Sequence, residues 1–329
     1  MQELSMTTME TLVMAFGAMG LGIILLVKGG NWTVDAAIFL AKHMGVSRLV
    51  IGLTVVAFGT SLPELVISVN SNYQNLPGIA LGNVIGSNTA NILLVIGATA
   101  LIGTLSVIPR LVIRDLSMML VATLILAGLM KYGTIGHLAG LLMIIILLLY
   151  TFWIYRKASV SGIETGEESE EPFFKNLKIS VLFLILGLLG ITAGAEFLVR
   201  GAKISAAIIG VPDAVIGLSI IAIGTSLPEL STCLVAAGKK QTDIVIGNIV
   251  GSNIFNILMI IGMTALLKPI QTGLAAAQLS ELDIWITLAV SLIFAAILFF
   301  YGKINRFIGI IFLGAYTVYM VSIFAFYIT

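Results

Sequence analysis

Residues 58–65 read FGTSLPEL, and residues 223–230 read IGTSLPEL. Both copies lie inside long apolar runs. Each adds a helix-breaking proline and a glutamate, and membrane helices rarely carry a glutamate. Glu64 and Glu229 are 229 − 64 = 165 residues apart. The recurrence indicates that one polar unit is built twice into an apolar chain.

The same offset of 165 residues relates a second motif. GNVIGSNTAN at residues 82–91 maps onto GNIVGSNIFN at residues 247–256. The register also holds outside the motifs, where it maps Gly29 onto Gly194. An ungapped register of this length predicts that the two halves of the chain are structural repeats.

The composition is that of an integral membrane protein. Of 329 residues, 59% are hydrophobic and 10% are charged, whereas soluble domains carry about 25% charged residues. The mean hydropathy is +1.13, and the short alternating strands of an outer-membrane barrel are absent. Because a spanning helix needs roughly 20 apolar residues, the sequence predicts an all-α membrane protein. The ten predicted spanning helices lie at residues 10–28, 36–70 (broken), 78–102, 109–130, 136–155, 176–199, 203–237 (broken), 243–267, 281–301 and 305–327.

A polar segment at residues 158–175 divides the chain into two units, residues 1–157 and 176–329. We predict that this segment is a solvated linker, and a weak regulatory cation site is the alternative. Each unit holds five helices, so the second unit enters the membrane from the opposite side. The sequence thus predicts inverted five-helix repeats with broken helices at the midplane. The linker carries the acidic residues Glu164, Glu167, Glu168, Glu170 and Glu171.

Lysine and arginine residues predict the orientation. With both termini outside and the linker in the cytoplasm, 13 basic residues, Lys28 among them, lie on the inner side and 4 on the outer side. This is the bias of the positive-inside rule. We therefore expect a multi-pass protein of the cell membrane, with no obligatory protein partner.

The two motif glutamates are the candidate functional residues. Among the acidic residues, only Glu64 and Glu229 are predicted to lie deep in a span, where a charge costs at least roughly 2.5–3.5 kcal/mol. Such a residue usually marks an ion path, and a structural pair or a neutral acid is the alternative. The prolines should open the helices near residues 57–61 and 222–226, so that backbone carbonyls line a cavity. The hydroxyls of Thr60, Ser61, Thr225 and Ser226 should join them.

The second motif supplies neutral oxygen atoms. Asn83, Ser87 and Asn91 recur every four residues and so share one helix face. Their counterparts are Asn248, Ser252 and Asn256. Interhelical hydrogen bonding is the alternative role for these amides.

Together, the motifs predict a site of hard oxygen donors, without thiolate or imidazole, which suits Ca²⁺ and argues against zinc, copper or iron. Two carboxylates neutralise one Ca²⁺, two Na⁺ or two H⁺. Since an empty site leaves two buried charges unpaired, the protein should change face only when loaded.

The paired motifs resemble the two repeats of the calcium/cation antiporter superfamily, most closely the prokaryotic sodium/calcium exchangers. This resemblance covers nearly the whole chain and implies four cation sites at the midplane. Glu64, Glu229 and the carbonyls of Thr60 and Thr225 would bind Ca²⁺. The resemblance also implies that the helices at 10–28 and 176–199 slide to alternate access. The flanking sodium sites would use Ser61, Ser226, Ser87, Ser252, Ala57 and Ala222, and the middle site would be lined by Asn91 and Asn256.

One position departs from some relatives, which carry aspartate where Asn256 stands. This departure suggests exchange of Na⁺ for Ca²⁺ that does not depend on K⁺. A proton/Ca²⁺ antiporter of the same superfamily is the main alternative, and a cation channel is a weaker one.

Other classes find little support in the sequence. We expect no enzyme activity and no cofactor, because the sequence has no zinc motif and no catalytic Ser–His pairing. The net charge of 17 − 16 = +1 disfavours a nucleic-acid partner. With Cys233 as the only cysteine, no disulfide can form within the chain.

Overall fold

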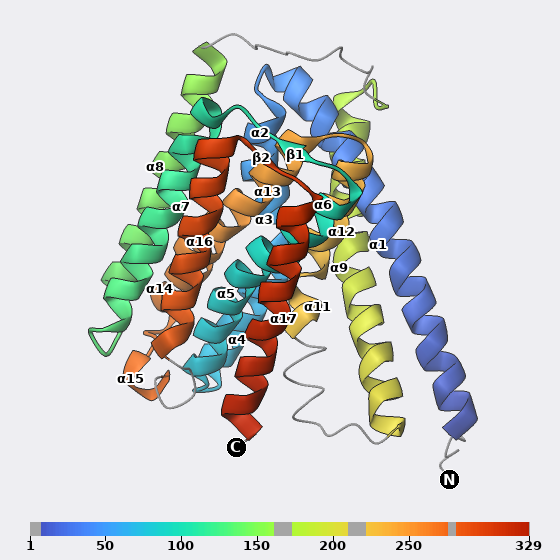
Figure 1. Ribbon diagram of the computed structural model, residues 1–329, viewed down its shortest axis with the longest axis vertical. Helices are drawn as coiled ribbons and strands as arrows, with labels where there is room; N and C mark the ends of the chain where they lie inside the picture. The colour runs from blue at the N-terminus through green and yellow to red at the C-terminus, as the bar shows by residue number, and fades with distance from the viewer. Residues whose placement is uncertain (1–7, 161–172, 210–221, 276–280, 329) are drawn as a thin grey trace.

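The computed structural model describes residues 8–160, 173–209, 222–275 and 281–328, which are almost entirely helical (Figure 1). The long helices are α1 (Thr8–Met44), α7 (Pro109–Met130), α8 (His137–Val160), α9 (Leu177–Ile208), α16 (Glu281–Tyr301) and α17 (Arg306–Ile328). Shorter segments in the first half are α2 (Arg48–Ile51), η1 (Gly52–Val56), α3 (Ala57–Thr60), α4 (Leu62–Tyr73), α5 (Pro77–Ala90), η2 (Asn91–Ile96) and α6 (Gly97–Ile102). Those in the second half are α11 (Ala222–Thr225), α12 (Leu227–Gly238), α13 (Thr242–Phe255), η4 (Asn256–Ile261), α14 (Gly262–Leu267) and α15 (Thr272–Ala275). The segments η1, η2 and η4 are π-helical.

The described helices confirm an all-α fold of the membrane type. Eight of them are long and apolar enough to cross a membrane, and the bent pair Arg48–Thr60 with Leu62–Tyr73 raises the number to nine. The predicted broken helix at 203–237 includes residues 210–221, which lie outside the described residues. The tenth span therefore stays a prediction.

One helix, α1, replaces the predicted break between residues 28 and 36. It runs unbroken from Thr8 to Met44, about 55 Å at 1.5 Å per residue. The polar residue in the predicted gap stays within the helix, because Asn31 Nδ2 donates to the Val27 carbonyl over 2.8 Å. Lys28 therefore lies within α1, and its predicted place on the inner side stays a prediction. Helix α9 likewise runs on to Ile208, past the predicted end at 199.

Glycines explain why α1 and α9 remain continuous and lie side by side (Figure 1). A Cβ at Gly22 would lie 2.7 Å from the Gly194 carbonyl oxygen, and one at Gly29 would lie 2.6 Å from that of Gly187. Only glycine permits this approach of two backbones. The glycines that interrupt the apolar run thus form a helix interface.

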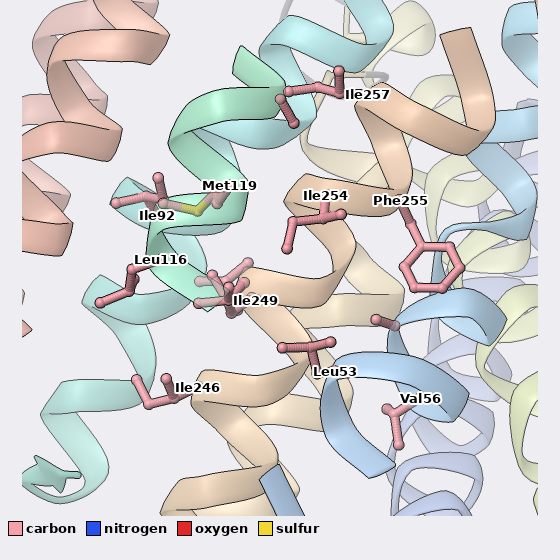
Figure 2. Close-up of a cluster of buried hydrophobic side chains, with 14 of the residues drawn as sticks. Leu53, Val56, Ile92, Leu116, Met119, Ile246, Ile249, Ile254, Phe255 and Ile257 are labelled. Carbon is pink, nitrogen blue, oxygen red and sulfur yellow. The ribbon is translucent and has the colours of Figure 1, made fainter. Parts of the chain in front are cut away.

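The core is built around α13. Every residue in the most apolar stretch of the span Thr242–Leu267 is buried inside the protein. Figure 2 shows how side chains from several segments meet there, with Met119 of α7 beside Ile92 of η2. Leu53 and Val56 of η1 belong to the same buried cluster. In contrast, many large apolar side chains of α1, α8 and α17 are exposed, as expected of helices that face lipid. The segment that carries the second GSN motif is thus the most enclosed part of the described chain.

The first broken helix opens less than we predicted for residues 57–61. Ala57–Thr60 remain one helical turn, and the Ser61 amide donates to the Ala57 carbonyl over 3.1 Å. The next helix begins at once, with Pro63 in its first turn. Since the first amides of a helix have no partner within it, proline there removes no hydrogen bond. The interruption is therefore a bend of 44°, not an unwound stretch.

The second broken helix is equally closed where it is described. Ala222–Thr225 form a helical turn, so the predicted opening over 222–226 is also wrong. The Ser226 amide donates to the Ile223 carbonyl over 3.1 Å, and helix α12 follows directly.

Both ends of the described chain lie at the same end of the bundle, as expected if the chain crosses it an even number of times. The start of α1 and the end of α17 lie at one end of the molecule, and the end of α8 and the start of α9 lie at the other (Figure 1). A short antiparallel sheet of β1 (Leu105–Ser106) and β2 (Lys303–Ile304) joins the two halves, with Leu105 opposite Ile304.

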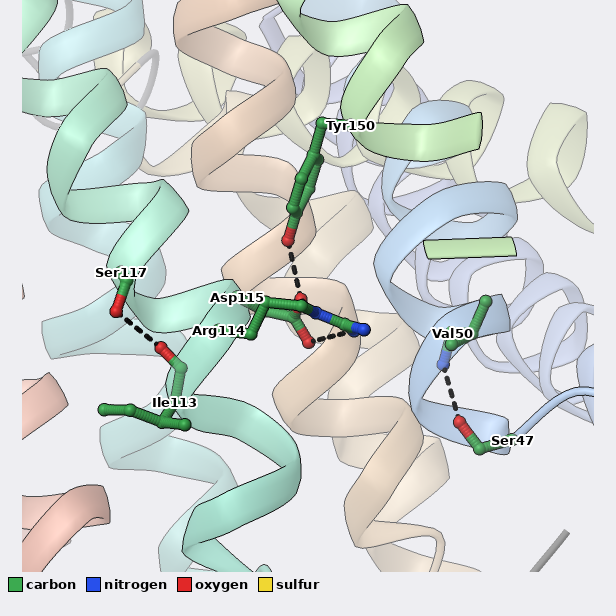
Figure 3. A network of polar contacts seen from close by, with 7 residues as sticks. All are labelled: Ser47, Val50, Ile113, Arg114, Asp115, Ser117 and Tyr150. Carbon is green, nitrogen blue, oxygen red and sulfur yellow. Dashed lines mark hydrogen bonds and ion pairs between the residues drawn. The ribbon is translucent and has the colours of Figure 1, made fainter. Parts of the chain in front are cut away.

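A buried ion pair lies in α7, near its start. Asp115 accepts from Arg114 Nε over 2.5 Å and from the Tyr150 hydroxyl of α8 over 2.7 Å (Figure 3). The Arg114 guanidinium also lies 5.4 Å from the Trp153 ring centroid. Asp115 is thus a satisfied structural charge, unlike the motif glutamates.

Candidate functional site

The two motifs break their helices at equivalent serines. Ser61 has φ −85° and ψ 2°, and Ser226 has φ −89° and ψ 3°, both outside the values of an α-helix. In each copy a new helix starts at the next residue, so Glu64 and Glu229 stand in the first turns of α4 and α12. A carboxylate is stabilised there, because the helix N-terminus carries partial positive charge.

The two carboxylates are buried and have no protein partner. Both glutamates are 0% exposed, and none of their four carboxylate oxygens accepts a hydrogen bond. The two groups are also close enough to interact electrostatically. Because buried charges are normally paired or bound to a metal, this pair has the character of a cation site.

Groups from both repeats lie around Glu229. The side chains of Thr60, Ser61 and Ser252 lie beside its carboxylate, although no hydroxyl meets it in hydrogen-bonding geometry. The Thr60 hydroxyl oxygen is 3.4 Å from Asn248 Oδ1 and 3.5 Å from Ser252 Oγ. The first motif of one half therefore faces the second motif of the other.

Further oxygen atoms among the predicted residues are buried without a partner. They belong to two kinds of group, hydroxyls and amide carbonyls, which are hard ligands suited to Ca²⁺ and Na⁺. Within the described residues, no group of three or more His, Cys, Asp or Glu side chains could hold a metal ion, so cation binding would depend on these neutral oxygens. They are Ser61 Oγ, Ser226 Oγ, Ser87 Oγ, Asn91 Oδ1 and Asn256 Oδ1.

Four asparagines, Asn88, Asn91, Asn253 and Asn256, form a buried cluster that we call the amide ring. Asn88 Nδ2 and Asn253 Nδ2 each donate to the other's main-chain carbonyl, over 3.2 and 3.3 Å. Asn91 Nδ2 donates to Asn253 Oδ1 over 3.1 Å, and Asn256 Nδ2 donates to Asn88 Oδ1 over 3.0 Å. The ring joins α5 and η2 to α13 and η4.

Three predicted residues differ from the rest of the set. The Ala57 carbonyl is not free, since it accepts from the Ser61 amide and, over 3.4 Å, from the Thr60 hydroxyl. Thr225 is half-buried in α11. Ala222 begins that helix, and its side chain lies outside the described residues.

A supporting pair was missed by the sequence analysis. Asn83 Nδ2 donates to the Glu64 carbonyl over 3.1 Å and to Ser68 Oγ over 2.9 Å. In the second half, Asn248 Nδ2 contacts Cys233 Sγ over 3.4 Å. Ser68 and Cys233 are 165 residues apart, so the repeat register was the signal that could have found them. The Cys233 thiol therefore contacts one of the motif asparagines.

The sequence matches a known protein family over both halves of the chain. The sodium/calcium exchanger protein family matches residues 14–156 and 179–325. The chain belongs to the sodium/calcium exchanger family.

Individual members of the family match almost end to end. An uncharacterized membrane protein of Methanocaldococcus jannaschii is 35% identical over 95% of this chain and 99% of its own length. The sodium/calcium exchanger MaX1 of Methanosarcina acetivorans is 30% identical over 92% and 97%. The structure of the sodium/calcium exchanger from Methanococcus jannaschii superposes with a TM-score of 0.80 at 32% identity, over 94% of this chain and 98% of that one. These matches confirm the resemblance to the exchangers. The protein is therefore a cation antiporter, and its family is one of transporters and not of enzymes.

Proposed function

We propose that the protein exchanges Na⁺ for Ca²⁺ across the cell membrane by alternating access, without a requirement for K⁺. One observation carries the proposal: Glu64 and Glu229 are fully buried, without a protein partner and close enough to interact electrostatically. Their two charges balance one Ca²⁺ or two Na⁺. Asparagine at 256 supports independence from K⁺, because the site then has no third carboxylate.

The proposed ligands are oxygen atoms of the two motifs and of the residues just before them. Glu64 and Glu229 bind Ca²⁺ together with the carbonyls of Thr60 and Thr225. The serine hydroxyls and the carbonyls of Ala57 and Ala222 serve Na⁺, and the Oδ1 atoms of Asn91 and Asn256 line the middle of the site. The unpartnered hydroxyls of Ser61, Ser226 and Ser87 support this division. The Ala57 carbonyl supports it least, since it already accepts two hydrogen bonds.

Charge explains why transport would be coupled. With no cation bound, two carboxylates that interact electrostatically lie unpaired in a buried environment, which is costly. Na⁺ or Ca²⁺ removes that cost, so the loaded states are the ones that change face. The result is exchange rather than leakage.

The proposed topology is ten helices in two inverted repeats, residues 1–157 and 176–329. Both termini are outside and the linker at 158–175 is cytoplasmic. The reciprocal bonds between Asn88 and Asn253 support an inverted arrangement, since equivalent residues meet about a local two-fold axis. The common end of α1 and α17 supports an even number of spans.

Transport by purified protein in sealed vesicles tests the function. Vesicles loaded with Na⁺ are diluted into Na⁺-free medium with radiolabelled Ca²⁺, with and without K⁺. We expect Ca²⁺ uptake that depends on internal Na⁺ and is unchanged by K⁺. Uptake driven by a pH gradient in the absence of Na⁺ would instead favour the proton/Ca²⁺ antiporter, and single-channel currents would favour a channel.

A further inference from the structure

The amide ring leaves two particular atoms free. All four Nδ2 atoms donate within the ring, and Oδ1 of Asn88 and of Asn253 each accept one of these bonds. Oδ1 of Asn91 and of Asn256 are the remaining side-chain atoms, and both are buried without a partner. The ring therefore distinguishes the oxygen end of each outer amide from its nitrogen end.

The free atoms belong to segments that pack against the glutamate helices. Segment η2, which begins at Asn91, contacts α12, and η4, which begins at Asn256, contacts α4. Those two helices carry Glu229 and Glu64 in their first turns. Each outer asparagine thus stands beside the helix that presents one carboxylate.

Turning an outer amide around would break the ring. If Asn256 exchanged its nitrogen and oxygen, its Oδ1 would face Asn88 Oδ1 at a distance that now holds a hydrogen bond of 3.0 Å. Two acceptors would then meet with no proton between them. Asn88 cannot turn to compensate, since its own Nδ2 would leave the Asn253 carbonyl. The inner pair, Asn88 and Asn253, therefore sets the orientation of the outer pair.

We propose that Asn88 and Asn253 are positioning residues that hold Oδ1 of Asn256 and Asn91 toward the transported cation. The proposal rests on the proposed function, because it names how the neutral oxygens of that site are oriented. It also adds a constraint: an ionised carboxylate at position 256 would place an oxygen without a proton against Asn88 Oδ1. With asparagine there, the negative charge of the site is that of Glu64 and Glu229.

A double-mutant cycle separates positioning from simple packing. Because Asn88 acts through Asn256, Asn88→Ala should raise the KM for Ca²⁺ about tenfold, the effect of one lost hydrogen bond of about 1.4 kcal/mol. In the Asn256→Ala background the same change should alter KM by less than about twofold. In the Asn91→Ala background, Asn88→Ala should still raise the KM about tenfold, because Asn91 donates its hydrogen bond to Asn253 and not to Asn88. Thr89→Ala is the matched control, as the Thr89 hydroxyl contacts Thr287 outside the ring.

The carboxylate constraint has its own test. Asn256→Asp should reduce kcat/KM for Ca²⁺ about tenfold or more. Adding Asn88→Ala removes the opposing oxygen, so the double variant should be more active than Asn256→Asp alone. A purely structural role for Asn88 would instead make the double variant worse.

The outcomes distinguish this inference from the proposed function. If wild-type protein shows no Na⁺-driven Ca²⁺ uptake, the proposed function is overturned and this inference with it. If wild-type transports but Asn88→Ala has an unchanged KM, or an equal effect in every background, only the positioning role is overturned. Should Asn88→Ala fail to fold, Asn256→Asp remains the test, and an unchanged kcat/KM for Ca²⁺ in that variant would overturn the inference.

Discussion

Asn88 and Asn253 each donate a hydrogen bond from Nδ2 to the main-chain carbonyl of the other, although 165 residues separate them. Residues that are equivalent in the repeat register thus meet each other directly. The crossing joins α5 to α13 within the buried core, close to the helices that carry the two glutamates.

Two buried serines of α4 and its preceding bend should respond oppositely to alanine. Ser61 Oγ has no partner, so Ser61→Ala breaks no hydrogen bond and should leave thermal stability unchanged while it weakens the dependence of transport on Na⁺. Ser68 Oγ accepts from Asn83 and donates to the Ala80 carbonyl. Ser68→Ala should therefore lower the free energy of unfolding by about 1–3 kcal/mol.

Thermal unfolding in detergent and Na⁺-dependent Ca²⁺ uptake, measured on both serine variants, check this contrast. Loss of stability in Ser61→Ala with unchanged Na⁺ dependence would show that the Ser61 hydroxyl is structural.

The α1–α9 interface should not tolerate a methyl group at its closest points. Gly22→Ala and Gly29→Ala would each place a Cβ within 2.7 Å of a backbone oxygen. Each should lower stability by about 1–3 kcal/mol, the usual cost of overpacking. Gly17 of the same helix has open space around it, so Gly17→Ala is the control and should not destabilise the protein. Melting temperatures of the three variants decide the matter, and equal values for all three would contradict the close packing.

The packing of α1 against α9 could not be predicted from the sequence. The repeat register and the apolar runs predicted the motifs, the spans and the central glutamates, because these depend on local composition. The same reasoning predicted separate spans at 10–28 and 36–70, because a spanning helix needs only roughly 20 apolar residues. The structure keeps the helix because Gly29 allows a neighbouring backbone to approach, and such a partner cannot be identified from one segment alone.

The site was predicted in the same partial way. Residue type identified Glu64, Glu229 and the neighbouring hydroxyls as oxygen donors. The resemblance assigned Asn91 and Asn256 to the middle of the site, but the sequence did not show what Asn88 and Asn253 contact. The structure shows Asn88 fully engaged in hydrogen bonds and Asn91 with one free oxygen.

The Asp115 network should contribute to stability and not to transport. Tyr150→Phe removes the 2.7 Å hydrogen bond to a buried carboxylate, which should cost about 1.5–3 kcal/mol. Ser117 of the same helix is exposed and bonds only to its own turn (Figure 3), so Ser117→Ala should be neutral. Chemical or thermal unfolding checks the difference, and the KM for Ca²⁺ should stay at the wild-type value in both variants. A changed KM in Tyr150→Phe would show that the network acts on the cation site.

The central claim is that Glu64 and Glu229 together hold one Ca²⁺. Equilibrium binding of radiolabelled Ca²⁺ to the purified protein in Na⁺-free detergent solution tests it most directly. We predict one tight site in the wild-type protein and at least about a hundredfold weaker binding in both Glu64→Gln and Glu229→Gln, because each change leaves one buried charge too few. Glu196→Gln, at an exposed ion pair with Arg200, should bind as wild type does. Wild-type affinity in either Glu64→Gln or Glu229→Gln would contradict the shared site.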